Sequence, residues 1–350
     1  MSTPAERIAE ACAGKRVTLM EVCGTHTVSL FRTGVRGMLP PSLKLLSGPG
    51  CPVCVTAQGY IDAALELAGR QGVTIATYGD MVRVPGRGGS LAEARARGAD
   101  LLVVYSAIDA VAWAAKHPER QVVFLAVGFE TTTPATAQAV LDAEEQGLTN
   151  FRVLTAHKLV VPAMLALLAG DGGAHLDGFL CPGHVSVVIG SEAYRPIVTR
   201  HGKGCVVAGF EAPSMLAGVQ RLCEMKRAGA PGLDNCYTVA VKPEGNPHAQ
   251  ALLDRVFEPA DATWRAMGTI PGSGLRLRPA YRRFDAAVHY GLDTERDDEP
   301  GACRCGEVIQ GKAEPKECPL FGNGCTPTNP VGPCMVSSEG TCAAWYKYGR

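Results

Sequence analysis

The apolar residues of this chain recur in short, β-branched runs, each of which ends in Gly, Pro, Thr or Ser and leads into a helical pattern. The runs are RVTLMEVCGTH, VTIATYGD, LLVVYS, VVFLAVGFETTTP, FRVLTAHK, GFLCPGHVS and CVVAGFEAPS. A repeated order of strand, short loop and helix is typical of parallel α/β layers. We therefore predict an α/β fold.

Polar and reactive side chains stand where these predicted strands end. They are Cys23, His26, Cys51, Cys54, Asp80, Glu130, His157, Cys181, His184 and Glu211. Parallel α/β sheets bind their ligands at the carboxyl ends of the strands. We expect most of the chemistry to converge on one or two such rims.

The pattern also predicts how the chain is divided. VGFETTTP at 127–134 and AGFEAPS at 208–214 resemble each other, and each follows a valine-rich strand. We predict two related parallel-sheet units that face a cleft, the first over residues 1–145 and the second over 146–240. The strand before Cys23 is compatible with packing in the second unit.

Residues 241–350 are predicted to form a connector and a small irregular C-terminal domain. From about residue 235 the pattern indicates one strand, one helix and then a Pro/Gly-rich loop, and an acidic segment follows at 293–300. The tail beyond it holds six cysteines and shows little helical or strand periodicity. Something other than apolar burial must therefore hold the tail together.

Charge and hydropathy exclude several classes of partner. Lys plus Arg equals Asp plus Glu, at 34 each, so no basic surplus indicates nucleic acid or an anionic membrane. The apolar stretch from Leu101 is interrupted by Asp109, and the N-terminus lacks a signal peptide's hydrophobic segment. We expect a cytoplasmic protein. Under reducing conditions its 14 cysteines point to metal ligation, thiol chemistry or burial.

The six cysteines of the tail are candidate metal ligands. They are Cys303, Cys305, Cys318, Cys325, Cys334 and Cys342. Their spacing matches neither a pair of Cys-x-x-Cys zinc knuckles nor a bacterial ferredoxin run. Four thiolates from scattered loop positions can still enclose a [4Fe-4S] cluster, and the remaining pair could exchange electrons with it as a disulfide. A structural zinc site with two buried thiols stays open as the alternative.

The Cys51-Pro-Val-Cys54 turn resembles the active turn of thiol oxidoreductases, so a redox role is favoured over half of a zinc site. Cys23 ends a predicted strand, with His26 three residues further on. A thiolate at Cys23 would be favoured by the positive end of the following helix and by a neighbouring imidazole. The alternative is an ordinary buried cysteine.

Two further loops are weaker candidates. In the loop of Glu130, Thr131 and Thr132, ordinary helix capping competes with ligand binding, because Thr133 and Pro134 suit the start of a helix. His184 is either a core histidine or a member of the same rim as Cys23. No Walker-type phosphate loop and no Ser/His/Asp order is present, so nothing indicates a kinase or a hydrolase.

Taken together, the motifs resemble the HypD family of [NiFe]-hydrogenase maturation proteins over nearly the whole chain. The matching segments are CGTHT at Cys23, GPGCPVCVT around Cys51, TYGDMVRVPG, GFETTTP, CPGHVSVVIG, GFEAPSML, KPEGNP, CRCGEVIQGK and CTPTNPVGPCMVSSEGTCAAWY. The combination is far more specific than any single motif.

The resemblance implies a scaffold on which iron receives cyanide and carbon monoxide. A HypC-type small chaperone would share the iron with Cys23, a HypE-type protein would deliver the cyanide, and the finished Fe(CN)2CO group would pass to the hydrogenase large subunit. Cys51 and Cys54 would be redox thiols beside the iron. His26, Glu130, Thr131, Thr132 and His184 would surround it.

For the tail, the resemblance implies a [4Fe-4S] cluster held by Cys303, Cys318, Cys325 and Cys342. Cys305 and Cys334 would form the cluster-adjacent pair, as in ferredoxin:thioredoxin reductase, although Cys303 and Cys305 are close enough in sequence to exchange roles. The same cysteines leave a second function open. That alternative is a cluster-dependent thiol-disulfide reductase acting on a protein disulfide.

Overall fold

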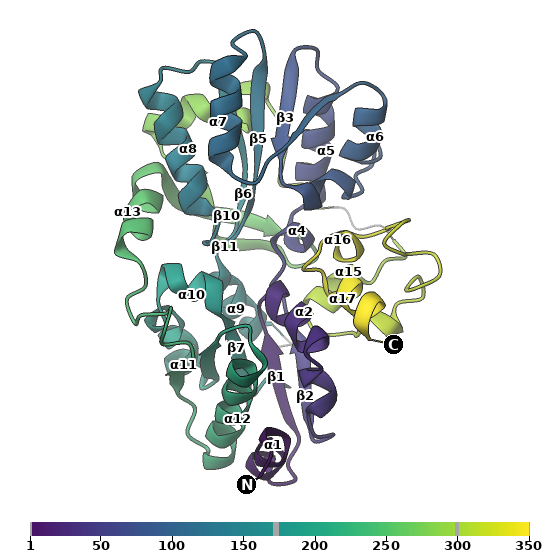
Figure 1. The fold of residues 1–350 in the computed structure, drawn as a ribbon, viewed down its shortest axis with the longest axis vertical. Coiled ribbons are helices and arrows are strands. Elements are labelled where there is room, and N and C mark those ends of the chain that lie inside the picture. Colours follow the sequence, from purple (N-terminus) through teal and green to yellow (C-terminus); the bar gives the residue numbers. More distant parts are fainter. Residues whose placement is uncertain (1, 171–174, 298–300, 350) are drawn as a thin grey trace.

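The computed structural model describes residues 2–170, 175–297 and 301–349. Two parallel sheets with helices around them make up most of the chain, and a two-stranded hairpin and an irregular C-terminal tail complete it (Figure 1). The predicted α/β class with two parallel sheets is therefore confirmed. The facing cleft and the iron–sulfur nature of the tail stay predictions.

The first sheet, in the upper half of Figure 1, has the strand order β4-β3-β5-β6. Its strands are β3 (Val73–Thr77), β4 (Asp100–Val103), β5 (Gln121–Gly128) and β6 (Phe151–His157). The helices around it are α5 (Gln58–Ala68), α6 (Leu91–Ala96), α7 (Ala107–Lys116) and α8 (Thr133–Glu145), with the 3-10 turn η1 (Gly79–Arg83). β5 is buried from its second residue onward, because helices cover both faces of the sheet.

The second sheet has the strand order β2-β1-β7-β8-β9. Its strands are β1 (Val17–Glu21), β2 (Leu43–Ser47), β7 (Gly178–Pro182), β8 (Gly204–Ala208) and β9 (Leu233–Asn235). The helices around it are α1 (Pro4–Cys12), α2 (Gly24–Arg32), α3 (Val35–Met38), α10 (Gly183–Ile189), α11 (Arg195–His201) and α12 (Ala212–Ala228), with the 3-10 turn η3 (Glu192–Tyr194). Every residue of β7 and β8 is buried.

The sheets divide the chain differently from the predicted boundary at residue 145. β6 pairs in parallel with β5 over seven residues and so lies in the first sheet. β1 pairs with β7 and lies in the second sheet. The first sheet is thus one continuous piece of chain, 73–157, inserted between the strands of the second. The β5–α8–β6 unit explains this, because a strand followed by one crossover helix commonly returns beside its own predecessor.

The connector contains a hairpin where the sequence pattern indicated a loop. The predicted helix is present as α13 (Pro247–Val256), but β10 (Phe257–Trp264) and β11 (Gly268–Leu277) pair antiparallel beyond it. The hairpin accepts Pro and Gly because its two strands have free edges and its register shifts after Ala260. Bridges to Thr56 and Lys158 attach it to the rest of the chain.

The remaining elements are short. They are α4 (Pro52–Val55), α9 (Val160–Ala169), the 3-10 turn η4 (Pro279–Phe284) and α14 (Ala286–Tyr290). The tail contains α15 (Cys305–Ile309), the 3-10 turn η5 (Pro315–Glu317), α16 (Pro333–Val336) and α17 (Thr341–Tyr348). Residues 298–300 of the acidic segment lie outside the described residues. One apolar core joins Cys51, Cys54, Cys305 and Cys334 with residues of both sheets.

Candidate functional site

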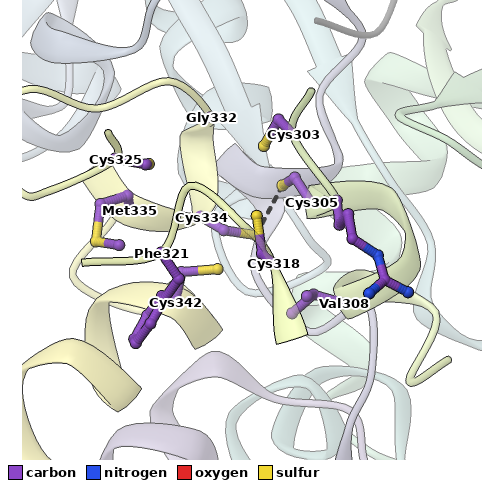
Figure 2. Close-up of a pocket in the computed structure, with 11 residues that line it drawn as sticks. Cys303, Cys305, Val308, Cys318, Phe321, Cys325, Gly332, Cys334, Met335 and Cys342 are labelled. Atoms are coloured by element: carbon purple, nitrogen blue, oxygen red, sulfur yellow. Dashed lines mark hydrogen bonds between the residues drawn. The ribbon is translucent and has the colours of Figure 1, made fainter. Parts of the chain in front are cut away.

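All six cysteines of the tail line one cavity, which we call the six-cysteine cavity (Figure 2). Val308, Phe321 and Met335 supply most of its apolar wall. The Sγ atoms of Cys305 and Cys334 lie 3.1 Å apart, and both residues are buried. The fold therefore gathers thiols that the sequence separates by up to 39 positions. Cys305 and Cys334 also interact with the thiols of Cys303 and Cys342, respectively.

The backbone around the cavity leaves room for sulfur. A Cβ at Gly332 would lie 2.9 Å from the Sγ of Cys303, so only glycine allows this approach. The amide of Val331 donates a hydrogen bond to the Sγ of Cys325 at 3.3 Å. Amide donors of this kind stabilise metal-bound thiolates.

The donor set fits an iron–sulfur cluster. Clusters are held by cysteine thiolates in pockets with hydrogen bonds to the sulfurs, and the cavity offers cysteine side chains, an apolar wall and one amide donor. Within residues 2–170, 175–297 and 301–349, no three His, Cys, Asp or Glu side chains are already arranged around a single metal ion. The cavity is thus lined by six thiols, the donors that both an iron–sulfur cluster and a structural zinc site use.

The tail packs against the helices that start at the other two thiol positions (Figure 1). α17 lies on α2, which begins directly after Cys23, and α16 lies on α4, which begins directly after Cys51. Asp80 holds the turn between α16 and α17, because its Oδ2 accepts hydrogen bonds from Ser337 Oγ and from the amide and Oγ of Ser338. The three cysteine groups therefore belong to one connected region.

Two glycines allow close packing around Cys23. A Cβ at Gly50 would lie 2.2 Å from the amide nitrogen of Cys23, and one at Gly24 would lie 2.4 Å from the Cβ of Glu339. The amide of Gly24 donates to the carbonyl of Gly50 at 2.8 Å. The loop before Cys51 and the tail thus both touch the backbone at Cys23, which ties its position to theirs.

Burial controls the protonation of Cys23. The thiol is only 8% exposed, and desolvation, followed by the carboxylate of Glu339, raises its pKa to about 12. The amides of His26 and Thr25 at the start of α2 lower the pKa but do not outweigh burial. The start of α2 thus favours the thiolate, as expected, but burial opposes it more strongly and keeps Cys23 protonated in the free chain.

Cys51 and Cys54 form a disulfide, with their Cα atoms 5.3 Å apart. Cys51 is 5% exposed and Cys54 1% exposed. Cys51 also caps α4, since its Sγ accepts a hydrogen bond from the amide of Cys54 at 3.2 Å. The turn is thus rigid, buried and in contact with α16 of the tail.

His26 and His184 meet at one aromatic ring. Their ring centroids lie 4.9 Å and 4.0 Å from that of Phe210. His26 Nε2 lies 3.0 Å from the carbonyl of Gly209, and its Nδ1 is buried without a partner. Burial lowers the pKa of His26 to about 4, so its ring is neutral, and Nε2 is the donor to the carbonyl. His26 thus points toward the end of β8 instead of activating Cys23.

Glu130 lies at the start of α9, apart from the threonine hydroxyls that follow it in sequence. Its Oε1 accepts a hydrogen bond from the amide of Val160 at 3.0 Å, its Oε2 has no partner, and burial raises its pKa to about 7. Thr132 and Thr133 donate to the carbonyl of Phe129 at 3.2 and 2.9 Å, while Thr131 is exposed. Local capping therefore uses most of this loop.

Comparison with known proteins fits the motifs. A family model described as HypD, hydrogenase formation hypA family, matches residues 1–349. The chain belongs to the HypD family. It is 47% identical over 348 residues to the hydrogenase maturation factor HypD of Azotobacter vinelandii, covering 98% of this chain and 92% of that relative.

Other HypD relatives are similar to the chain over nearly its whole length. The chain is 44% identical to the hydrogenase maturation factor HypD of Cupriavidus necator over 349 residues, with 98% of this chain and 92% of the relative covered. The corresponding factor of Escherichia coli is 44% identical over 338 residues, with 96% and 90% covered. The resemblance of the sequence to the HypD family is thus confirmed. In the described parts of the chain, no helix combines the length and the apolar character of a membrane span.

Two carboxylates beside Cys23, those of Glu21 and Glu339, were not predicted from the sequence. Glu21 is buried at the end of β1, where its Oε2 accepts from the amide of Cys23 at 3.0 Å and its Oε1 from Thr27. Burial raises its pKa to about 7. Glu339 accepts a hydrogen bond from Thr25 at 2.5 Å. A charged residue inside the apolar run before Cys23 could have revealed Glu21, whereas no local pattern places Glu339 there.

Proposed function

We propose that this chain is an assembly scaffold in [NiFe]-hydrogenase maturation, on which iron acquires cyanide and carbon monoxide. The observation that carries the proposal is the packing of the tail on α2 and α4, which brings the six-cysteine cavity next to Cys23 and the Cys51–Cys54 disulfide. The curated relatives named as hydrogenase maturation factors support the same process. Three sulfur groups in one region suit a protein that combines metal holding with electron transfer.

In this proposal the tail holds a [4Fe-4S] cluster through Cys303, Cys318, Cys325 and Cys342. Such a cluster, when bound, supplies single electrons. Cys305 and Cys334 form the neighbouring pair, which their 3.1 Å sulfur separation and their burial support. The amide of Val331 orients Cys325, and Gly332 keeps the backbone clear of Cys303.

The iron that is being assembled is the cargo, and Cys23 is its proposed ligand, shared with a HypC-type chaperone. A HypE-type protein would deliver cyanide, and the product would pass to the hydrogenase large subunit. Soft thiolate ligands suit low-spin Fe(II). Because Cys23 is a neutral buried thiol in the free chain, iron binding must release its proton. Glu339 and Glu21 are the carboxylates placed to affect that step.

A stand-alone thiol-disulfide reductase is the alternative for the same cysteines. Its disulfide would have to reach the disulfide of a protein substrate, as thiol exchange requires direct attack of sulfur on sulfur. Cys51 and Cys54 are almost completely buried. Burial supports an internal role for this disulfide and disfavours the reductase.

The test is infrared spectroscopy of the chain, purified without oxygen together with a HypC-type partner. We expect bands of bound cyanide and carbon monoxide, a brown protein with about four irons in the tail, and loss of the bands in Cys23→Ala with the cluster intact. Cys236→Ala, at a half-buried cysteine of the second sheet, is the matched control and keeps the bands. A colourless chain with one zinc, or bands that survive Cys23→Ala, would contradict the proposal.

A further inference from the structure

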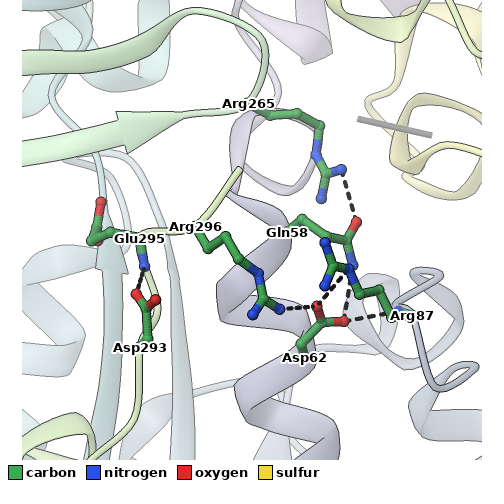
Figure 3. A network of polar contacts seen from close by, with 7 residues as sticks. All are labelled: Gln58, Asp62, Arg87, Arg265, Asp293, Glu295 and Arg296. Carbon is green, nitrogen blue, oxygen red and sulfur yellow. Dashed lines mark hydrogen bonds and ion pairs between the residues drawn. The ribbon is translucent and has the colours of Figure 1, made fainter. Parts of the chain in front are cut away.

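Arg265 is a buried arginine in the turn of the β10–β11 hairpin, 2% exposed. Its backbone amide donates to the carbonyl of Val55 at 2.9 Å, and its Nε donates to the carbonyl of Thr56 at 3.0 Å. Its Nη1 donates to the Oε1 of Gln58 at 3.1 Å (Figure 3). The guanidinium is thus bound to the segment that directly follows Cys54.

Among the described residues, the guanidinium of Arg265 is in direct contact with no carboxylate. Its Nη2 is buried without a hydrogen-bond partner, and among the described residues no carboxylate forms an ion pair with it. The acid of the same network, Asp62, is taken by Arg87 and Arg296 (Figure 3). Burying a cation without a partner is unfavourable, and a negative charge that forms nearby during function would offset this cost.

Two acids of the segment before residue 298 bind the backbone on either side of Arg265. Asp297 accepts from the amide of Ala266 at 2.7 Å, and Glu295 accepts from the amide of Thr263 at 2.6 Å. Both also act on the charge of the buried Lys158. Among the described residues neither carboxylate forms an ion pair with Arg265, and the Oδ1 of Asp297 is itself buried without a hydrogen-bond partner.

The other side of the same turn faces the tail. Gln310, which ends α15, donates to the carbonyl of Ala266 at 2.7 Å. Trp264, the residue before Arg265, shares one apolar core with Cys54 and Cys305. Arg265 thus lies between the disulfide turn and the six-cysteine cavity, the two places where reduction would create negative charge.

We propose that Arg265 is the internal counter-cation for the negative charge gained when the Cys51–Cys54 disulfide, and a cluster held in the six-cysteine cavity, accept electrons. The proposal rests on the proposed function and deepens it. Two electrons from a one-electron donor of the ferredoxin class, with one proton, convert the disulfide into one thiol and one thiolate. The site gains one negative charge in that step, and the guanidinium offsets it. Arg265 acts through the sulfur groups and is a positioning residue.

The test compares reduction potentials in the full chain, purified without oxygen. Cluster midpoints are measured by redox titration with electron paramagnetic resonance, and the disulfide is equilibrated with dithiothreitol buffers and quantified by alkylation and mass spectrometry. Arg265→Gln should disfavour reduction about tenfold at each centre, which is about 59 mV for the one-electron couple and about 30 mV for the two-electron couple. Arg265→Lys, which keeps the charge, should remain within about threefold of the wild type.

Two control variants distinguish the effect of the charge of Arg265 from the effect of its hydrogen bonds on stability. Arg87→Gln removes a more exposed arginine of the same network, and solvent screening should leave both potentials unchanged. Gln58→Leu removes the acceptor of Nη1 but leaves the charge, so it should lower stability and spare the potentials. A tenfold shift in this variant would overturn the proposal even if Arg265→Gln does not fold.

Three results would overturn the proposal: unchanged potentials in folded Arg265→Gln, an equal loss in Arg265→Lys, or a tenfold shift in Gln58→Leu. The disulfide titration needs no cluster, so it still decides the role of Arg265 in a chain without iron. Absence of iron would instead count against the proposed function, and the two failures are therefore distinguishable.

Discussion

The two sheets and the C-terminal tail reach a defined structure in different ways. In β5, every residue from Val122 to Gly128 is buried, and helices supply the apolar cover. The tail, over residues 301–349, has only short helices and turns, and sulfur atoms line its central cavity. Parallel sheets hold their shape through apolar burial, whereas small irregular regions need metals or cross-links.

Folding and metal loading are expected to be coupled in the tail and independent in the two parallel sheets. The two parallel sheets with their helices, which we call the sheet half, have their own apolar core and should fold without metal. A tail built around thiols should become ordered when the thiols bind a metal. Since the tail also touches Cys23 and α4, metal in the tail would fix the surroundings of the other two sulfur groups.

The largest effect is expected from Cys325→Ser, which removes a buried ligand candidate. We expect loss of the cluster absorption and rapid proteolysis within residues 301–349, with the circular dichroism of the sheet half retained. Cys205→Ala is the matched control. It deletes a fully buried sulfur of β8 and should lower the free energy of unfolding by about 1 kcal/mol without changing the iron content. Equal loss of iron in both variants would refute the distinction between the two regions.

The sequence predicted the sheet half well because its signals are local. All seven β-branched runs contain strands, and the reactive residues follow strand ends, as with Glu130 after β5. β2 and the β10–β11 hairpin were missed, because LKLLS is a short edge strand and the hairpin is interrupted by Pro271 and Gly272.

The contacts of the site could not be predicted in the same way. Glu339 reaches Thr25 across 314 positions, and Arg265 reaches Gln58 across 207. Such contacts depend on how separate units pack, which leaves no periodic trace in the sequence. The six cysteines were recognisable from composition, but their common cavity became visible only in three dimensions.

The second effect concerns pH and the sheet half. Burial raises the pKa of Glu130 to about 7, above the value of 4.5 of an unperturbed glutamate. The folded chain therefore binds more protons than the unfolded chain between these values, so stability falls as the pH rises through this window and the loss is complete above it. Over 2.5 pKa units the upper limit is about 3 kcal/mol.

Urea titrations from pH 4.5 to 8 of the wild type and Glu130→Gln check this expectation. The variant keeps an acceptor for the amide of Val160 and should gain stability relative to the wild type as the pH rises. Glu145→Gln, at the exposed end of α8, should leave the difference flat. A constant difference for Glu130→Gln across the range would show that its carboxyl group does not carry this part of the pH dependence. If the pH changed only the rate at which the tail is proteolysed, the pH dependence would arise in the tail and not in the sheet half.

The smallest effect is expected where the two regions are joined. Asp80→Asn keeps the shape of the side chain but removes the charge that accepts three hydrogen bonds from Ser337 and Ser338. Because hydrogen bonds to a half-buried carboxylate are partly screened by solvent, we expect a local loss of about 1 kcal/mol, read as several-fold faster hydrogen exchange in α16 and α17.

Asp109→Asn is the control for Asp80→Asn. It weakens the capping box of α7 in the first sheet and should leave exchange in the tail unchanged. If Asp80→Asn instead accelerated exchange in β3 and β5, the carboxylate would stabilise the sheet half and not the tail. Exchange confined to α16 and α17 would mean that one side chain from the first sheet holds the tail's turn against Gly24, and that the position of Glu339 beside Cys23 depends on it.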